Sequence, residues 1–257
     1  LNSSADVLPQ PEFEDVFAAV AERRATHGIL PIENTIGGTI HRNYDLLLGN
    51  ALLIVGEVKL PVVHNLIVLE GTSIEQVRRV YSHPQGLAQC ERFLRTLANI
   101  EIVATYDTAG SAKMINEEQL RDSAAIASER AAEVFGLRVL QSGIQDYPNN
   151  FTRFLLVGPE ATPLGPPNKT TIVFTVANEA GALVKALSVF ALREIDLTKL
   201  ESRPIPDRPF EYLFYADLAI NREDVRCVRA LTHLAEFAPS VRTLGSYPAW
   251  HEPESLD

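Results

Sequence analysis

The chain has 257 residues, of which 46% are hydrophobic and 22% are charged, and this is the composition of an ordinary globular protein with room for two domains. A run of about 18 apolar residues, the least that spans a membrane, does not occur in it. The formal net charge of −10 argues against nucleic acid as a partner, because phosphates require a basic surface. A small anionic ligand remains compatible, since it needs only a few local donors.

The two cysteines, Cys90 and Cys227, lie far apart in the sequence, each within a helix-like apolar pattern. We expect two buried, reduced thiols rather than a disulfide or a metal site. The sequence contains no Rossmann fingerprint, P-loop or His/Cys metal spacing. The sequence therefore offers no residue pattern that points to a metal or a cofactor.

Residues 1–158 are predicted to alternate between strands and helices, which favours mostly parallel sheets with helices on both faces. Short apolar runs give strand candidates at 28–32, 51–60, 65–70, 80–82, 101–104 and 124–127. Helices are predicted over 72–80, where Ser73 and Gln76 are spaced as a capping box, over 83–97 and 108–120, and over 128–136, where Gly136 closes the helix.

A second region follows a segment rich in proline and glycine, which is predicted to be a linker. Beyond it the order strand, helix, strand, strand, helix, strand predicts a ferredoxin-like domain. Three apolar faces are predicted: Ile172, Phe174 and Val176 on the first strand, Leu183, Leu187 and Phe190 on the first helix, and Val225, Val228, Leu231 and Leu234 on the second helix.

Polar groups follow the first predicted strand in the segment PIENTIGGT. Glu33, Asn34 and Thr39 supply polar side chains, and two adjacent glycines let backbone amides approach a ligand closely. Ligands of open α/β sheets collect outside the carboxyl ends of strands, so this segment is a candidate site. A tight turn after a strand explains the same residues.

A second candidate is the segment YSHPQGLAQC. Ser82 and His83 precede a predicted helix whose first turn offers unpaired N–H groups, with Gln85 in that turn and Gln89 one turn later on the same face. This favours an anion site. An ordinary helix cap with an exposed histidine is the alternative.

Two further segments carry polar groups at element boundaries. In YDTAGSA, Asp107 or Thr108 is expected to cap a helix that also carries Ser111, and a purely structural cap is the alternative. In NNFTRFLLVG, the polar residues Asn150, Thr152 and Arg153 enter an apolar strand, and a polar strand edge is the alternative.

Taken together, the segments PIENTIGGTIHRNYDLLL, SHPQGLAQC, DTAGSA and NFTRFLLVG resemble, in order and spacing, the catalytic domain of prephenate dehydratases. Downstream, NEAGALVKAL, ESRP and FEYLFYADL are similar to the phenylalanine-binding ACT domain fused to that enzyme. The resemblance covers residues 10–248. The segment GGTIHRNYDLLL also resembles plastid arogenate dehydratases and their bacterial relatives.

The resemblance implies an α/β fold with a two-lobed, periplasmic-binding-protein-like catalytic domain at 1–158. Lobe 1 would comprise about 1–62 and 146–158, and lobe 2 about 63–145. A linker at 159–168, a ferredoxin-like ACT domain at 169–248 and a tail at 249–257 would follow. Family members begin with a strand and a Gly-rich loop similar to GxxGAYSE, and the printed sequence enters after both. We therefore expect lobe 1 to miss a central strand and part of the substrate cleft.

The reaction implied by the resemblance removes carbon dioxide and hydroxide from prephenate to give phenylpyruvate, in phenylalanine biosynthesis. Thr152 is the implied catalytic residue, hydrogen bonding to the leaving hydroxyl directly or through water. Arg153 would either pair with a substrate carboxylate or orient its strand. The remaining implied substrate residues are Asn34, Ser82 and Gln89, with Thr108, Ser111 and Asn150 as neighbours, and then Thr39, Gln85, Glu33 and His83, the last two of which could face away from the cleft.

The ACT resemblance implies a phenylalanine effector site between two subunits of a homodimer or homotetramer. Its implied contacts are Asn178, Gly181, Ala182, Leu183, Glu201 and Ser202. The expected location is the cytoplasm, or the plastid stroma for a plant or algal protein. Two other functions stay open: arogenate dehydratase, which would give phenylalanine directly, and a non-catalytic protein that senses amino acids.

Overall fold

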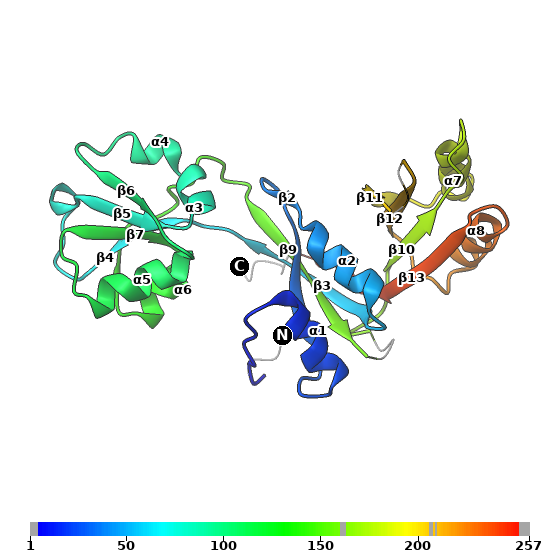
Figure 1. The fold of residues 1–257 in the computed structure, drawn as a ribbon, viewed down its shortest axis with the longest axis horizontal. Coiled ribbons are helices and arrows are strands. Elements are labelled where there is room, and N and C mark those ends of the chain that lie inside the picture. The colour runs from blue at the N-terminus through cyan, green and yellow to red at the C-terminus, as the bar shows by residue number, and fades with distance from the viewer. Residues whose placement is uncertain (1–4, 160–162, 206–207, 209, 252–257) are drawn as a thin grey trace, which may run out of the picture. The chain divides into compact units, whose positions relative to one another are not determined.

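The computed structural model describes residues 5–159, 163–205, 208 and 210–251. The chain forms two compact units, one made of residues 1–59 and 153–257 and the other of residues 60–152. The backbone therefore passes between the units twice, after Lys59 and after Thr152. The first unit contains most of the predicted lobe 1 together with the ferredoxin-like region, whereas residues 60–62 and 146–152, which were predicted for lobe 1, belong to the second unit. The predicted linker and tail lie partly outside the described residues. Figure 1 shows the elements of both units.

The unit of residues 60–152 is built on a five-stranded sheet with strand order β6-β5-β7-β4-β8 (Figure 1). Strand β5 pairs parallel to β6 and β7, whereas β4 pairs antiparallel to β7 and β8. Helices connect β5 to β6 and β6 to β7, and parallel pairing needs such crossovers, but β4 leads to β5 without an α-helix. The prediction of a mostly parallel sheet is therefore wrong here. The elements are β4 (Asn65–Val68), β5 (Arg79–Ser82), α3 (Pro84–Ala88), α4 (Glu91–Leu94), β6 (Glu101–Ala104), α5 (Thr108–Glu117), β7 (Ser123–Ala127), α6 (Glu129–Val134) and β8 (Arg138–Gln141).

Two of the predicted helices in this unit differ from the structure. The capping box of Ser73 and Gln76 forms, but it starts only one 3₁₀ turn (Ile74–Gln76), because buried Val77 is extended and leads directly into β5. The helix predicted over 83–97 is divided into α3 and α4 at Cys90, whose φ of −121° is not helical. The closure of α6 at Gly136, with φ +61°, is confirmed.

The first part of the other unit is a four-stranded sheet, with order β2-β1-β9-β3, and two helices (Figure 1). The strands predicted over 28–32 and 51–60 are confirmed as β1 and β3. Sequence reasoning assigned no element to either helix or to the short β2. The bounds are α1 (Phe13–Ala21), β1 (Gly28–Asn34), β2 (Gly38–Thr39), α2 (His41–Gly49), β3 (Leu53–Pro61) and β9 (Phe151–Gly158).

The ferredoxin-like order predicted for the C-terminal region is confirmed. Its antiparallel sheet has strand order β11-β12-β10-β13, and Ile172 and Phe174 of β10 pack with α7 and α8 in one apolar core. The predicted face of α8 is confirmed for Leu231 and Leu234, which pack in this core, and wrong for Val225 and Val228, which are 59% and 48% exposed. The smaller Cys227 and Ala230 are buried instead of the two valines. The bounds are β10 (Lys169–Thr175), α7 (Ala182–Ala191), β11 (Leu197–Pro204), β12 (Tyr212–Leu218), α8 (Val225–Ala235) and β13 (Ser240–Tyr247).

The two sheets of this unit share one hydrophobic core. Val173 and Tyr215 on the ferredoxin-like sheet belong to the same buried cluster as Leu30 and Ile54 on the first sheet. The approach is close at Gly245, where an added Cβ would lie 2.2 Å from the backbone oxygen of Ile54. The ferredoxin-like sheet therefore has two buried faces, one against its own helices and one against the first sheet.

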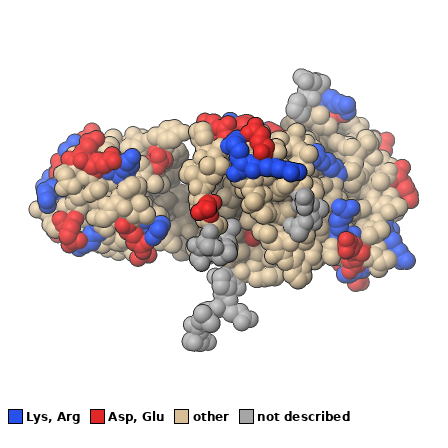
Figure 2. Space-filling model, turned by 90° about the horizontal axis from the view of Figure 1, so that it is seen from below, with Lys and Arg blue, Asp and Glu red and all other residues tan. Residues whose placement is uncertain are grey.

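The surface and the cysteines agree with the expectations from composition. Acidic and basic side chains are interspersed over the face shown in Figure 2. Both thiols are free and buried, and burial raises the pKa of Cys90 to about 12 and that of Cys227 to about 11. In the part of the chain that is described, no helix has the length and apolar character needed to cross a membrane.

Candidate functional site

Three buried polar side chains meet in the unit of residues 60–152, and we call His64, Gln89 and Asn150 the amide cluster. The Gln89 side-chain oxygen lies 2.7 Å from His64 Nε2 and accepts a hydrogen bond from Asn150 Nδ2 at 3.0 Å. Each of the three is at most 9% exposed. The hydrogen bond between Gln89 and Asn150 joins residues 61 apart in the sequence, and Asn150 is two residues before Thr152.

Gly86, in the first turn of α3, lies next to the amide cluster. A Cβ built on it would lie 2.9 Å from Ser82 Oγ, 3.4 Å from Thr108 Cγ2 and 3.8 Å from His64 Cε1. The Ser82 hydroxyl is buried and donates to the backbone oxygen of Ile126 at 2.8 Å, so its oxygen lone pairs stay able to accept a further hydrogen bond. The structure thus gathers the predicted residues Ser82, Gln89, Thr108 and Asn150 and adds His64, which sequence reasoning missed.

The remaining predicted residues of this unit have mainly local contacts. The His83 ring caps α3, its Nδ1 accepting from the backbone N–H of exposed Gln85 at 3.1 Å. Ser111 is buried within α5, donates to the backbone oxygen of Asp107 and lies 2.6 Å from the Thr105 hydroxyl. These contacts match the capping alternatives, and substrate contacts for these residues stay a prediction.

Asn34 and Thr39 lie on the hairpin of β1 and β2. The Asn34 side-chain oxygen accepts from the backbone N–H groups of Ile36 and Gly37 at 3.0 and 2.7 Å, which closes a tight turn of the Asx type. Gly38 follows with φ +80°. The alternative of a tight turn therefore describes this stretch, and a substrate contact of Asn34 stays a prediction.

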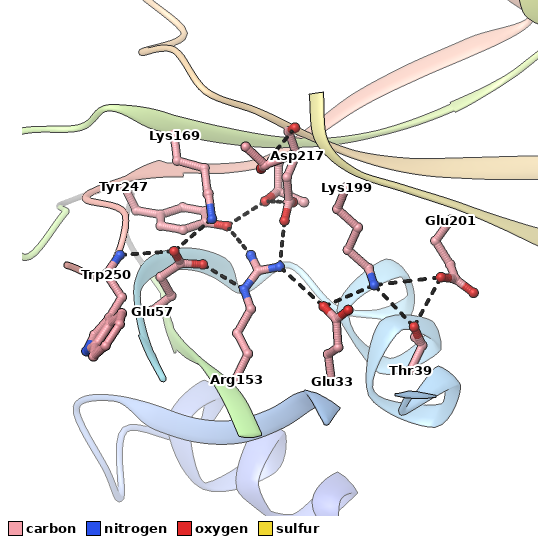
Figure 3. Close-up of polar contacts among 12 residues, drawn as sticks. Glu33, Thr39, Glu57, Arg153, Lys169, Lys199, Glu201, Asp217, Tyr247 and Trp250 are labelled. Atoms are coloured by element: carbon pink, nitrogen blue, oxygen red, sulfur yellow. Dashed lines mark hydrogen bonds and ion pairs between the residues drawn. The ribbon is translucent and has the colours of Figure 1, made fainter. Parts of the chain in front are cut away.

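Arg153, on β9, is the centre of what we call the ionic network: Arg153, Glu57, Asp217 and Lys169. Its guanidinium contacts Glu57 Oε2 at 2.7 Å through Nε and Asp217 Oδ2 at 2.6 Å through Nη1. Nη2 donates to the Tyr247 hydroxyl at 3.1 Å. Lys169 Nζ lies 2.7 Å from the other oxygen of Glu57 (Figure 3). Two cations and two carboxylates balance, so Arg153 has no uncompensated charge for a substrate carboxylate.

The pKa shifts agree with this pairing. Burial acts to raise the pKa of Glu57, but Arg153 and Lys169 outweigh burial and hold that pKa below its ordinary value. Burial acts to lower the pKa of Arg153, and Asp217, Tyr247 and Glu57 raise it further than burial lowers it. Because its charge is internally balanced, the geometry favours orienting the strand over substrate pairing as the role of Arg153.

A third cation, Lys199 on β11, connects the β1–β2 hairpin to the ferredoxin-like sheet. We call Lys199, Glu33 and Glu201 the Lys199 bridge. Lys199 Nζ lies 3.1 Å from Glu33 Oε2 and 3.7 Å from Glu201 Oε2, and the Lys199 side chain is 10% exposed. Glu201 also accepts from the Thr39 hydroxyl at 3.1 Å (Figure 3). Glu33 Oε2 lies 3.8 Å from Arg153 Nη1, which joins the bridge to the ionic network.

Comparisons with known proteins identify the family. The family model described as prephenate dehydratase matches residues 1–162. An Arabidopsis thaliana protein named arogenate dehydratase/prephenate dehydratase 2, chloroplastic, is 48% identical over 256 residues, 95% of this chain. The chain belongs to the prephenate dehydratase family.

Solved structures of similar proteins reproduce the fold. A prephenate dehydratase from Arthrobacter aurescens, in complex with L-Phe, superposes with a TM-score of 0.83 at 31% identity, covering 93% of this chain and 80% of that one. A protein described as a novel type of quorum-quenching acylase gives a TM-score of 0.85 at 34% identity, covering 95% and 89%. This chain spans 62% to 67% of the length of the plant relatives compared with it.

The predicted effector residues of the ACT region lie at two places. Gly181 precedes α7 with φ +83°, a left-handed conformation that favours glycine, while Asn178 is exposed and Ala182 is buried. On β11, Glu201 and Ser202 point to opposite faces because strand side chains alternate, and only Glu201 faces the first sheet. Phenylalanine contacts at these residues stay a prediction.

Sequence reasoning missed five residues of these sites: His64, Glu57, Lys169, Lys199 and Asp217. Four of them are charged residues in strands, and Glu57 and Asp217 interrupt apolar runs. A buried charge needs a partner, so such interruptions are a usable signal for an ionic network, although the sequence does not show which charges pair. Among the described residues no group of three or more His, Cys, Asp or Glu side chains is placed to hold a metal ion.

Proposed function

We propose that the protein is a dehydratase that converts prephenate to phenylpyruvate in phenylalanine biosynthesis. The carbon–carbon bond to the ring carboxylate breaks, its electron pair enters the ring, and the ring carbon–oxygen bond breaks at the same time. One proton joins the departing hydroxide, so prephenate dianion and a proton give phenylpyruvate, carbon dioxide and water. Aromatisation of the ring supplies the driving force.

One observation carries this proposal beyond family membership. Gln89 and Asn150, both implied substrate residues, hydrogen bond to each other, and Asn150 lies two residues before Thr152. Both side chains are uncharged amides, and both are buried. Uncharged donors suit this reaction, because they can hold an anion without leaving a buried charge when carbon dioxide departs. Ser82 and Thr108 converge on the same place at Gly86.

Thr152 has the role of hydrogen bonding to the leaving hydroxyl, directly or through a water molecule. A threonine hydroxyl is too weak an acid to protonate a leaving group alone, so it must act within a preorganised set of donors. The amide cluster supplies that set next to Thr152. Arg153 follows on the opposite face of β9, where the ionic network fixes the strand.

The test is Thr152→Ala in the full-length protein, with Thr152→Ser as the variant that keeps the hydroxyl. We expect Thr152→Ala to lower turnover about 10²–10³-fold, the usual effect of losing one positioned donor, and Thr152→Ser to retain most of it. Thr96→Ala, which removes an exposed hydroxyl bonded to the Phe93 backbone oxygen, is the control. Unchanged turnover in Thr152→Ala would exclude Thr152 as the catalytic residue.

The second candidate substrate is arogenate, and the names of the plant relatives favour testing it. The elimination is the same, but arogenate carries an ammonium where prephenate carries a keto group, so discrimination depends on which side chains meet that atom. Measuring turnover of prephenate and of arogenate with the same protein preparation shows whether the protein is a prephenate dehydratase or an arogenate dehydratase. If the two rates are equal, both names apply.

The regulatory part of the proposal is that phenylalanine binds the ACT region of a homodimer or homotetramer located in the cytoplasm, or in the plastid stroma of a plant or alga. The Arthrobacter relative supports it, since that prephenate dehydratase was solved with L-Phe. Light scattering gives the oligomer size, and phenylalanine should raise the melting temperature by mass action. Stabilisation by phenylalanine without turnover of either substrate would instead favour a non-catalytic sensor.

A further inference from the structure

The β11 strand presents alternate side chains to two different environments. Lys199, Glu201 and Arg203 face the first sheet and are partly buried, whereas Leu200 and Ser202 are exposed on the other side. β11 is also an edge strand, because the sheet order is β11-β12-β10-β13. The ESRP segment therefore contacts the first sheet on one side and leaves its other side and its free edge open to a ligand or a second subunit, and the Glu201 side chain is still 25% exposed.

Lys199 is the cation on the inner side of β11 that two carboxylates share. Glu33 belongs to β1 and Glu201 to β11, so the single ammonium connects the first sheet to the edge strand. With a side chain only 10% exposed, the ammonium interacts more strongly than a surface pair would. A change at Glu201 must therefore alter how strongly Lys199 holds Glu33.

From Glu33 the contacts continue to the catalytic strand. Glu33 Oε2 lies 3.8 Å from Arg153 Nη1, and Arg153 is the residue after Thr152. Figure 3 shows the same succession, from Glu201 through Lys199 and Glu33 to the guanidinium. The residues from Glu201 to Arg153 all lie in one compact unit, and Thr152 is the last residue of the other unit.

We propose that Lys199 couples the phenylalanine site to catalysis: occupancy of the ESRP segment is transmitted from Glu201 through Lys199 and Glu33 to Arg153, which positions Thr152. The inference rests on the proposed function, because it concerns the regulation of that reaction. In the state described here Glu201 holds Lys199 and Thr39. When the ammonium of a bound amino acid takes Glu201, Lys199 keeps Glu33 as its carboxylate partner together with the Thr39 hydroxyl, and the two states bind the effector unequally.

The protein contains its own reporter for this pathway. Trp250 is the single tryptophan of the chain, and its backbone N–H donates to Glu57 Oε1 at 3.0 Å within the ionic network. Lys59 Nζ lies 6.0 Å from the centre of its ring. A rearrangement that reaches Arg153 and Glu57 should therefore change tryptophan emission, and added phenylalanine contributes no tryptophan signal.

The experiment compares three substitutions of Lys199 in the full-length protein. Lys199→Met and Lys199→Gln remove the charge, and Lys199→Arg keeps it. Arg242→Met is the matched control, since Arg242 also joins the ferredoxin-like sheet to the first region, through the backbone oxygens of Leu48 and Asn50, but lies outside both the ESRP segment and the succession. Phenylalanine affinity by calorimetry, inhibition relative to each variant's own basal turnover, and Trp250 emission are measured for every variant, with melting temperature as the check on folding.

For the two neutral variants we expect the inhibition of turnover at saturating phenylalanine to be at least about 10-fold weaker than in the natural protein, while the dissociation constant changes less than about threefold. Their emission response to phenylalanine should disappear, whereas Lys199→Arg and Arg242→Met should respond as the natural protein does. Inhibition that persists in both neutral variants, or that weakens only in proportion to affinity, would overturn the coupling role. A natural protein that turns over neither substrate would refute the proposed function instead. In that case phenylalanine affinity and Trp250 emission would still test whether Lys199 transmits binding to Glu57 and Arg153.

Discussion

The amide cluster and the ionic network are both buried polar groups next to Thr152, but they differ in charge. The amide cluster of His64, Gln89 and Asn150 joins an imidazole ring to two side-chain amides. The ionic network holds two cations and two carboxylates within 2.7 Å contacts. Ions that are paired this closely have little left for a ligand, whereas amide and hydroxyl groups retain donors and lone pairs.

The difference in charge indicates that the amide cluster and the ionic network have different roles. Asn150 and Thr152 precede the crossing between the units and belong with the neutral groups, and Arg153 follows the crossing and belongs with the ions. A buried ion pair is expensive to form but also expensive to break on one side, so it fixes geometry well. The neutral groups are therefore suited to binding and the ions to positioning, and the substitutions below test that distinction.

The largest effect is expected from Arg153→Met. Removing one partner of a buried ionic network leaves Asp217 and part of Glu57 without a counter-charge, which costs about 3–5 kcal/mol of unfolding free energy. Arg203→Met, whose pair with Asp45 is partly exposed, should cost at most about 1 kcal/mol. Urea denaturation measures both. Equal losses would show that burial of the ionic network adds nothing.

Gln89→Leu tests the neutral side of the comparison. It leaves His64 and Asn150 without their shared acceptor, for which we expect about 1–3 kcal/mol in stability, less than for Arg153 because no charge is orphaned. Turnover should fall about 10²-fold, as for loss of one positioned donor or acceptor. Gln85→Leu, exposed on α3, is the control and should stay within about 0.5 kcal/mol. A loss of stability with full turnover would make the amide cluster purely structural.

Gly245→Ala separates packing from charge in the contact between the two sheets. The new Cβ would lie 2.2 Å from the Ile54 backbone oxygen, so the sheets must shift, and we expect a loss of about 1–3 kcal/mol. Gly165→Ala places its Cβ at an ordinary 3.6 Å from Pro248 and should cost nothing measurable. Thermal unfolding distinguishes the two. If Gly245→Ala also weakened inhibition by phenylalanine, packing would share in the coupling.

The sequence predicted the ferredoxin-like order and most strands correctly, because apolar periodicity and turn residues are local signals. It failed where local signals conflict with tertiary contacts. The capping box at Ser73 begins only one turn because Val77 is needed in the core, and the buried face of α8 uses Cys227 and Ala230 rather than its valines. Such choices depend on how closely elements approach each other, which the sequence does not record.

The candidate site was predicted unevenly for a similar reason. Gln89 and Asn150 were assigned to the site from recognisable motifs, and the structure joins them by a hydrogen bond that the motifs could not foresee. His64, Glu57 and Asp217 stand in ordinary apolar surroundings, and only the fold brings them to their partners. Arg153 shows the consequence: its motif left two roles open, and its partners from distant strands favour one of them.

The smallest expected effect is the dependence of the ionic network on pH. Arg153 and Lys169 hold the pKa of Glu57 below its ordinary value of 4.5, so the folded protein binds the Glu57 proton less readily than the unfolded chain. The stabilisation is therefore complete above the ordinary carboxyl pKa and is lost as pH falls through the lower pKa of the folded state, at about 1.4 kcal/mol for a pKa difference of one. The experiment compares the unfolding free energies of the natural protein and Glu57→Gln from about pH 7 to about pH 3. They should differ by a constant amount above about pH 5 and converge below it.

Because the other carboxylates titrate in both proteins, their contributions largely cancel in the difference. A difference that widens on acidification would mean that the two cations do not hold Glu57 ionised. The ionic network would then not fix the strand that carries Thr152.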